Sequence, residues 1–130
     1  MEAPPAERVR ILVVDDEPLV EHALAEALRQ AGHDVTAVPD GARGLELLLS
    51  STPFDLVFCD LMMRGMTGMA LAAILRERAP HRLEHIVYMS GGAFTPEAKS
   101  FQEAHAAQSV DKPFDIVQET RSRMQARRKA

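Results

Sequence analysis

The sequence has little of several features that mark other classes of protein. Its 130 residues include a single cysteine, Cys59, which excludes an internal disulfide framework and fits a reducing compartment. The longest purely apolar run near its start, Ile11-Leu12-Val13-Val14, is too short for a signal-peptide core or a membrane span. Basic charge is not in excess, because 15 Lys and Arg against 19 Asp and Glu give a net charge of −4. We therefore expect a cytoplasmic protein that neither inserts into membranes nor binds nucleic acid.

Length and composition are those of one ordinary globular domain. Hydrophobic residues make up 46% and charged residues 26% of the chain, and roughly two-thirds of its unfolded surface can be buried at this length. Residues 1–7 carry two prolines and two acids, and we interpret them as a disordered leader or the remnant of a linker. The domain is expected over residues 8–126, followed by a basic tail over 127–130.

Short β-branched runs alternate with longer segments of helical period along the whole domain. Strands are expected over residues 9–14, 35–38, 54–59, 86–89 and 109–110. Helices are expected over 18–31, 40–50 and 67–79, from Thr95-Pro96 onward, and from Asp115 onward. Strict alternation predicts an α/β fold, in which a parallel sheet carries helices on both faces. Sites in such sheets form beyond the carboxyl ends of the strands.

Three acids stand at those strand ends. Asp15 and Asp16 directly follow the first expected strand, and Asp60 follows the third. Adjacent carboxylates resist ionisation unless a cation joins them, and oxygen ligands suit Mg²⁺, with Mn²⁺ as the alternative. The competing interpretation is that these acids are only turn formers and helix caps. Because parallel strands would bring all three to one edge, we favour the metal site.

Two further polar groups follow later strands. Ser90 precedes two glycines that let the backbone approach an anion closely, and Lys112 precedes Pro113, which disfavours helical geometry at Lys112. An ammonium directed into a carboxylate cluster can pair with an acid or with a bound phosphoryl group. Acids, a hydroxyl and an ammonium around a metal ion are the parts of a site that handles phosphoryl groups.

With these residues in view, the sequence resembles the receiver domains of two-component response regulators. Four motifs match in order over about residues 8–126, namely Ile11-Leu12-Val13-Val14-Asp15-Asp16-Glu17-Pro18, Asp55-Leu56-Val57-Phe58-Cys59-Asp60-Leu61-Met62-Met63, Met89-Ser90-Gly91-Gly92 and Asp111-Lys112-Pro113-Phe114. The resemblance implies a flavodoxin-like, doubly wound sheet of five strands in the order 2-1-3-4-5 with five helices. It also implies a signalling domain rather than an enzyme, one that assists its own phosphorylation and dephosphorylation.

The resemblance further implies a role for each site residue. Asp60 would accept a phosphoryl group from a phosphohistidine on a histidine kinase or a histidine phosphotransfer protein. Asp16 and Asp60 would bind Mg²⁺ directly, Asp15 through metal-bound water, and Met62 through its backbone carbonyl. Lys112 would contact Asp60 before the reaction and the phosphoryl oxygen afterwards.

Conformational output is expected to begin at Ser90, whose hydroxyl would swing toward the phosphoryl oxygen. The sequence departs from the family here, because Ser109 stands where receiver domains often carry a switching aromatic residue. Output is therefore either a subtle conformational change or onward phosphotransfer. Arg64 is a second departure, since it replaces a usual proline, and we expect its side chain to point to solvent.

Other functions remain as alternatives. One is a pseudo-receiver that only binds partners, and another is a phosphatase with an aspartyl-phosphate intermediate. The phosphatase would need a second acid two residues after the nucleophile, where this chain has Met62. The domain is expected to be a monomer or weak dimer, either stand-alone or from a hybrid histidine kinase in bacteria. We expect no DNA-binding output domain, since the chain ends at residue 130.

Overall fold

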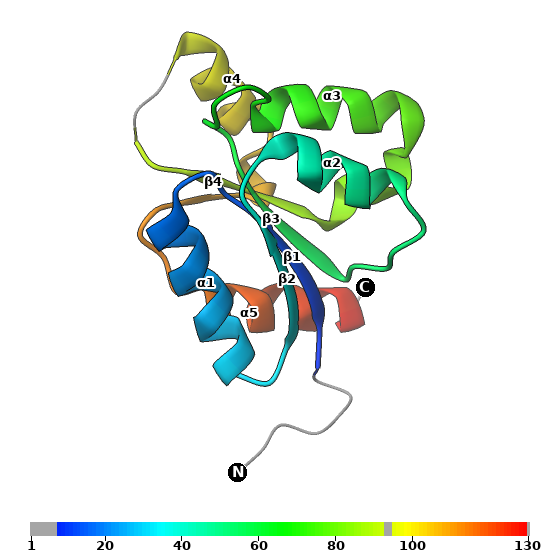
Figure 1. Ribbon diagram of the computed structural model, residues 1–130, viewed down its shortest axis with the longest axis vertical. Helices are drawn as coiled ribbons and strands as arrows, with labels where there is room; N and C mark the ends of the chain where they lie inside the picture. The colour runs from blue at the N-terminus through cyan, green and yellow to red at the C-terminus, as the bar shows by residue number, and fades with distance from the viewer. Residues whose placement is uncertain (1–7, 93–94, 130) are drawn as a thin grey trace.

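A single parallel sheet forms the centre of the protein. The computed structural model describes residues 8–92 and 95–129, so the expected leader over residues 1–7 lies outside the described residues. Within them, the strands stand in the order β2-β1-β3-β4-β5, as the resemblance implies (Figure 1). Every neighbouring pair is parallel. The strands are β1 (Arg10–Val14), β2 (Asp34–Val38), β3 (Leu56–Asp60), β4 (Ile86–Ser90) and β5 (Ser109–Asp111).

Helices connect these strands in the predicted alternation. They are α1 (Pro18–Gln30), α2 (Gly41–Leu49), α3 (Gly68–Arg78), α4 (Pro96–Ala104) and α5 (Ile116–Lys129). Two 3₁₀ helices that the periodicity did not predict, η2 (Pro80–His85) and η3 (Ala106–Gln108), precede β4 and β5. The last helix continues through residues 127–129, so this part of the expected basic tail is helical.

Side-chain caps begin the helices where the sequence predicts them. The Asp40 carboxylate accepts a hydrogen bond from the backbone N–H of Arg43 at 2.8 Å, at the start of α2. Thr95 caps α4 in the same way through the N–H of Ala98 at 3.1 Å. Each cap satisfies one of the backbone donors that the first helical turn leaves unpaired, which defines where the helix begins.

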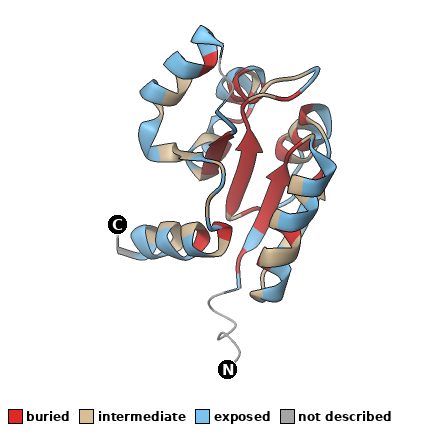
Figure 2. Cartoon of the chain, turned by 90° about the vertical axis from the view of Figure 1, so that its left-hand side faces the viewer, coloured by how far each residue is buried: buried red, intermediate tan, exposed pale blue. Residues whose placement is uncertain are grey.

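Two hydrophobic cores lie on opposite faces of the sheet. Helices α1 and α5 cover one face, where Leu28 and Ile116 pack with Ile11, Val13 and Phe58. Helices α2, α3 and α4 cover the other face with a second set of buried residues, among them Leu48, Leu71, Leu75 and Ala98. Every residue of β3 and β4 is buried, so the sheet is enclosed on both sides, as a parallel sheet requires (Figure 2).

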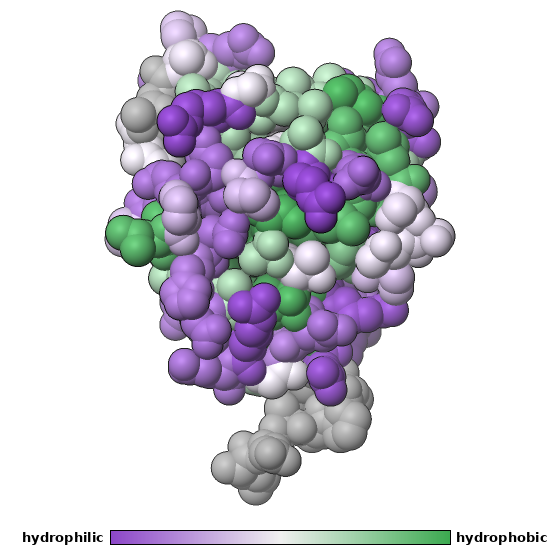
Figure 3. Space-filling view, viewed as in Figure 1, coloured by the Kyte–Doolittle hydropathy of each residue, from purple (hydrophilic) through white to green (hydrophobic). Residues whose placement is uncertain are grey.

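The outer surface is largely hydrophilic. In the face that Figure 3 shows, hydrophobic residues gather mainly over α2 and α3, and hydrophilic residues cover most of the remainder. No helix within residues 8–92 and 95–129 combines the length and the apolar character that crossing a bilayer demands.

The expected bounds of the third strand were wrong by two residues at its start and one at its end. Strand β3 begins at Leu56, because Asp55 turns its carboxylate to the backbone N–H of Arg10 at 2.9 Å and to its guanidinium. At the other end, Asp60 pairs in register with Met89 of β4, so it is the last residue of the strand rather than the first residue after it. This pairing anchors the Asp60 main chain to the middle of the sheet.

The connection after β3 depends on a glycine at the start of α3. A Cβ atom at Gly68 would lie 2.5 Å from the backbone carbonyl oxygen of Asp60 and 3.0 Å from the Cα of Leu61. Neither neighbour is a flexible side chain, so the helix can approach the strand end this closely only because residue 68 is glycine. Helix α3 therefore begins in direct contact with the main chain of Asp60.

Candidate functional site

Three carboxylates meet at the carboxyl edge of the sheet. One oxygen from each of Asp15, Asp16 and Asp60 lies within 4.8 Å of the other two. Asp15 and Asp60 are buried and Asp16 is partly exposed, which leaves the cluster open to solvent on one side. The neighbouring strands β1 and β3 hold the acids together, as their positions in the sequence predict. Such a set of oxygen ligands can hold a hard divalent cation.

Lys112 supplies the positive charge of the cluster. Its Nζ lies 2.8 Å from Asp15 Oδ2 and 3.5 Å from Asp60 Oδ2, and the side chain is 15% exposed. The expected contact with Asp60 is thus present, but Asp15 is the nearer partner. Burial acts to lower the pKa of Lys112, but its hydrogen bond with Asp15 and the charges of both acids outweigh burial and raise it. Lys112 therefore stays cationic.

Burial dominates the electrostatics of Asp60. Removal from water raises the pKa of its carboxyl to about 6, and the opposite charge of Lys112 offsets only part of this effect. The charge of Asp15 raises it further, whereas the backbone N–H of Met62, 3.4 Å from Asp60 Oδ1, lowers it. Asp60 is therefore ionised near neutral pH, at a cost to the stability of the fold.

This cost predicts that replacing Asp60 with asparagine stabilises the metal-free protein. An acid whose pKa is raised in the folded state takes up protons on folding between pH 3.8 and about 6, so stability falls as the pH rises through that window. We expect Asp60→Asn to raise the free energy of unfolding by about 1–3 kcal/mol near pH 7. Urea unfolding in EDTA measures this. The gain should vanish below about pH 4, and a gain that persisted there would contradict the electrostatic cause.

Ser90 and Met62 flank the acids. Ser90 is buried at the end of β4, and its carbonyl accepts a hydrogen bond from the backbone N–H of Lys112 at 2.7 Å. Its hydroxyl is 3.4 Å from the N–H of Gly92. Met62 contributes its backbone N–H to Asp60, and the role expected for its carbonyl stays a prediction. The structure thus places Ser90 at the end of β4 and Lys112 directly after β5, the neighbouring strand, with the ammonium against the acids.

Arg64 joins the site in a way that the sequence did not indicate. Its side chain is 93% exposed, in line with the expectation that it points to solvent. Its backbone N–H, however, donates to Asp16 Oδ2 at 2.9 Å, and its Nε lies 3.7 Å from the same oxygen. The amide bond ties the loop after β3 to the acidic cluster. The one sequence signal for it is the departure noted above, since the proline usual at this position has no backbone N–H to donate.

An aromatic group does lie behind Ser109, although Ser109 itself is small. Tyr88 of β4 pairs with Ser109 in register and is buried. Its ring meets Phe101 of α4 edge-on at 4.9 Å, and the ring of His105 lies 5.8 Å away. Ser109 donates its hydroxyl to the carbonyl of His105 at 2.8 Å. The end of α4 is therefore anchored to the sheet at two points, through the ring of Tyr88 and through the Ser109 hydroxyl.

Comparison with known proteins shows which family the chain belongs to. The family model of the response regulator receiver domain matches residues 11–122, which is most of the chain. The chain belongs to the response regulator receiver domain family. This receiver domain is 33% identical over 110 residues to the transcriptional regulatory protein CseB of Streptomyces avermitilis, covering 85% of the chain and 45% of that protein. The receiver domain thus spans less than half of that relative's length.

Solved structures share the fold of this receiver domain. The chemotaxis protein CheY4 of Vibrio cholerae is 26% identical with a TM-score of 0.70, covering 92% of this chain and 98% of that one. The receiver domain of a sensor histidine kinase from Pseudomonas aeruginosa PAO1, solved with magnesium coordinated in its active-site cleft, has a TM-score of 0.73 at 22% identity. The match covers 88% of this chain and 93% of that one, and at this identity it bears on the fold.

Proposed function

We propose that this receiver domain accepts a phosphoryl group on Asp60 in a reaction that requires Mg²⁺. The observation that carries the proposal is the buried arrangement of Asp15, Asp60 and Lys112 beside the partly exposed Asp16. If the cluster served only as a structural ion pair, one acid would be enough to pair with Lys112. The cluster instead holds three acids, and it is open to solvent on the side of Asp16. Such an excess of buried negative charge is expected where a cation binds.

The residues present fit a magnesium ion. All three acids offer carboxylate oxygen, and burial together with mutual repulsion makes the metal-free cluster unfavourable, as the raised pKa of Asp60 indicates. Asp16 and Asp60 would hold the ion directly, Asp15 through water, and Met62 through its carbonyl. When bound, the ion would neutralise the negative charge of the carboxylates and of the incoming phosphoryl oxygens.

The chemical step would use an Asp60 carboxylate oxygen as the nucleophile. It forms a bond to phosphorus while the phosphorus–nitrogen bond of a donor phosphohistidine breaks, and the bonding pair leaves with the imidazole. The Lys112 ammonium would donate a hydrogen bond to the transferred phosphoryl group. Because Lys112 already contacts both Asp15 and Asp60, it can turn to the new oxygen with little displacement. The Ser90 hydroxyl would then bond to a second oxygen and move the loop that follows β4.

The partner would be a histidine kinase or a histidine phosphotransfer protein, in the cytoplasm. Membership of the receiver domain family, together with the likeness to a transcriptional regulatory protein, supports this partner class. Onward phosphotransfer is the output that we favour over a large conformational change, because Ser109 carries no aromatic ring to move. A pseudo-receiver that only binds partners is the alternative.

Incubation with acetyl phosphate tests the proposal directly. The intact mass should rise by one phosphoryl group in the presence of Mg²⁺, as acetate leaves, and should stay unchanged in EDTA. Asp60→Asn should show no gain under either condition, whereas Asp55→Asn, a partly exposed acid at the other end of β3, should behave like the unaltered chain. No gain in a folded protein that binds Mg²⁺ would favour the pseudo-receiver. A gain that survived Asp60→Asn would contradict the assigned phosphoacceptor.

A further inference from the structure

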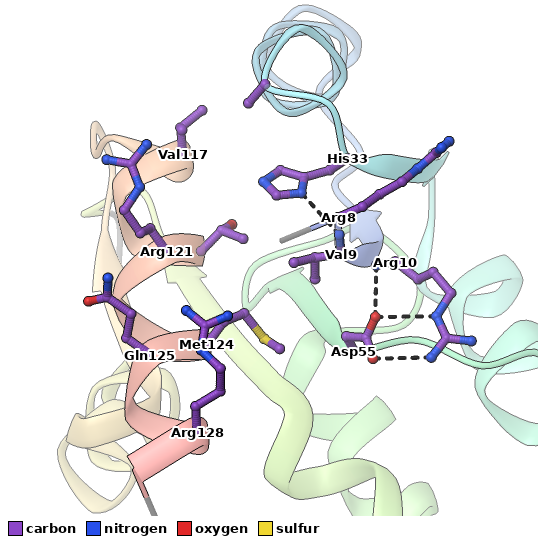
Figure 4. A pocket seen from close by; sticks show the side chains of 12 residues that line it. Arg8, Val9, Arg10, His33, Asp55, Val117, Arg121, Met124, Gln125 and Arg128 are labelled. Carbon is purple, nitrogen blue, oxygen red and sulfur yellow. Dashed lines mark hydrogen bonds and ion pairs between the residues drawn. The ribbon is translucent and has the colours of Figure 1, made fainter. Parts of the chain in front are cut away.

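A second concave site lies at the opposite edge of the sheet from the acids. This basal pocket has a volume of about 490 Å³, and α5 together with the starts of β1 and β3 forms its walls. Among its lining residues are Arg8, Arg10, Asp55, Thr120, Arg121 and Arg128 (Figure 4). Its volume falls within the range of roughly 300–1,000 Å³ that is common for pockets of small ligands.

The charge of the basal pocket is opposite to that of the whole chain. Four arginines line it with one carboxylate, Asp55, whereas the net charge of the chain is −4. Asp55 already accepts hydrogen bonds from the backbone N–H, Nε and Nη2 of Arg10, so this pair is self-sufficient. Within the described part of the chain, Arg8, Arg121 and Arg128 form no ion pair. All three are exposed, and Arg121 makes only a long hydrogen bond, from its Nη1 to Gln118 Oε1 at 3.4 Å. Figure 4 shows the Arg8 and Arg121 side chains toward the two sides of the pocket, so these flexible side chains would turn inward to meet an anion.

His33 adds a neutral donor to these cations. Its Nδ1 accepts a hydrogen bond from the backbone N–H of Val9 at 3.1 Å, so that nitrogen carries no proton. Burial, and after it the charge of Arg121, lowers the pKa of His33 and keeps the ring neutral near pH 7. The proton of the neutral ring must then sit on Nε2, which Figure 4 shows turned toward α5 across the pocket.

A buried hydroxyl and an apolar wall complete the pocket. Thr120 is fully buried in α5, and among the described residues its Oγ1 has no hydrogen-bond partner. An unpaired buried hydroxyl is costly, and a ligand atom that bonded to it would offset that cost. Because Oγ1 has essentially no exposed surface, this bond requires a small movement of the wall between Thr120 and the pocket. Val117 and Met124 lie on the same helix, and Figure 4 shows Met124 and Arg128 extending from α5 into the space in front of Val9. The ligand therefore needs an apolar part as well as an anionic part.

We propose that the basal pocket binds a phosphorylated small molecule of about the size of a nucleoside diphosphate. Its phosphate groups would be held by Arg121 and Arg128, and its apolar part would lie against Val117 and Met124. Guanidinium groups match phosphate oxygens in planar pairs, and a concave pocket suits a small molecule better than an acidic protein surface, which favours flatter contacts. The site lies at the amino ends of the strands, so its occupancy does not require the acidic cluster.

Titration of the full chain with ADP in EDTA tests the proposal, since without divalent cations the acidic cluster repels the nucleotide. Calorimetry should detect binding, and the amide signals of Val9, His33 and Thr120 should shift. Arg121→Gln combined with Arg128→Gln should weaken binding roughly tenfold or more, and Thr120→Val should also weaken it. The matched control is Arg76→Gln combined with Arg78→Gln, two exposed arginines of α3, which should leave the affinity unchanged.

Two further probes separate the sources of the attraction. Inorganic pyrophosphate that binds more weakly than ADP would support a contact with the apolar part of the ligand. Absence of ADP binding at millimolar concentration, or an affinity unchanged in the arginine double variant, would overturn the proposal. Binding of hexaglutamate without binding of ADP would also overturn it, in favour of an acidic protein partner.

Discussion

Replacing Lys112 with methionine is expected to lower the free energy of unfolding by about 3 kcal/mol near pH 7 in the absence of divalent cations. Asp15 and Asp60 are buried, and Lys112 is the one cation within 4 Å of either carboxylate among the described residues. Removal of the ammonium leaves two negative charges together in a poorly solvated place, which costs far more than the pair itself contributes. Urea unfolding in EDTA measures the loss.

Three comparisons identify charge as the cause of this loss. Lys99→Met, at an exposed position of α4, should change stability by less than about 0.5 kcal/mol. Adding Asp15→Asn to Lys112→Met should restore part of the stability. It removes one of the buried negative charges that are left unpaired when the ammonium, 2.8 Å from Asp15 in the unaltered protein, is lost. The deficit should also shrink as the pH falls and the acids become protonated. A loss that is independent of pH would mean that Lys112 acts through packing.

Arg82 is the second residue whose replacement should have a large effect. Only 7% of it is exposed, its Nε donates to the carbonyl of Leu48 at 2.9 Å, and its Nη2 donates to the carbonyls of Ser50 at 3.0 Å and Thr52 at 2.6 Å. These bonds hold the connection from α2 to β3. Because hydrogen bonds to a charged group contribute about 1.5–3 kcal/mol each, Arg82→Met should lower the free energy of unfolding by about 3–5 kcal/mol.

The matched control for Arg82 is Arg78, which is exposed in the last turn of α3. Arg78→Met should change stability by less than about 0.5 kcal/mol. Arg82→Lys keeps the charge but loses the fork of donors, so an intermediate loss is expected. If Arg82→Met were no more harmful than Arg82→Lys, the stability would come from packing of the aliphatic stem, and the hydrogen bonds would be unimportant.

The fold was predictable because its signals are local. Helix starts follow from caps such as Asp40 and Thr95, and the strands follow from short apolar runs, so the alternation alone implied a parallel sheet. The bounds of β3 were not predictable in this way. They depend on whether Asp55 bonds to Arg10, 45 positions away in the chain, and on whether Asp60 finds a partner in Met89. Neither contact can be predicted from the hydrophobic pattern of the residues around the strand.

The sequence predicted which residues meet at the site, but it did not predict which of them form hydrogen bonds or ion pairs with one another. Strand ends identified Asp15, Asp16 and Asp60 because topology brings carboxyl ends of parallel strands together. The preference of Lys112 for Asp15 depends on fractions of an ångström that no spacing encodes. The hydrogen bonds from Arg82 to three carbonyls are likewise not predictable, because every residue carries a carbonyl. For the bond from the Arg64 amide to Asp16, the absence of the usual proline shows only that an N–H is available, not which group accepts it.

The contact between Gly68 and the carbonyl oxygen of Asp60 makes the join of β3 to α3 a rigid joint rather than a hinge. Elsewhere in the core, a small displacement of one element can be absorbed when a side chain changes its rotamer. Here the backbone of Gly68 contacts the backbone of Asp60 with no room for a Cβ atom, so no side chain can adjust to absorb a displacement. Any movement of the Asp60 main chain must therefore carry the first turn of α3 with it. A change at this one aspartate would then be felt along the whole outer face of α3, far from the carboxylates themselves.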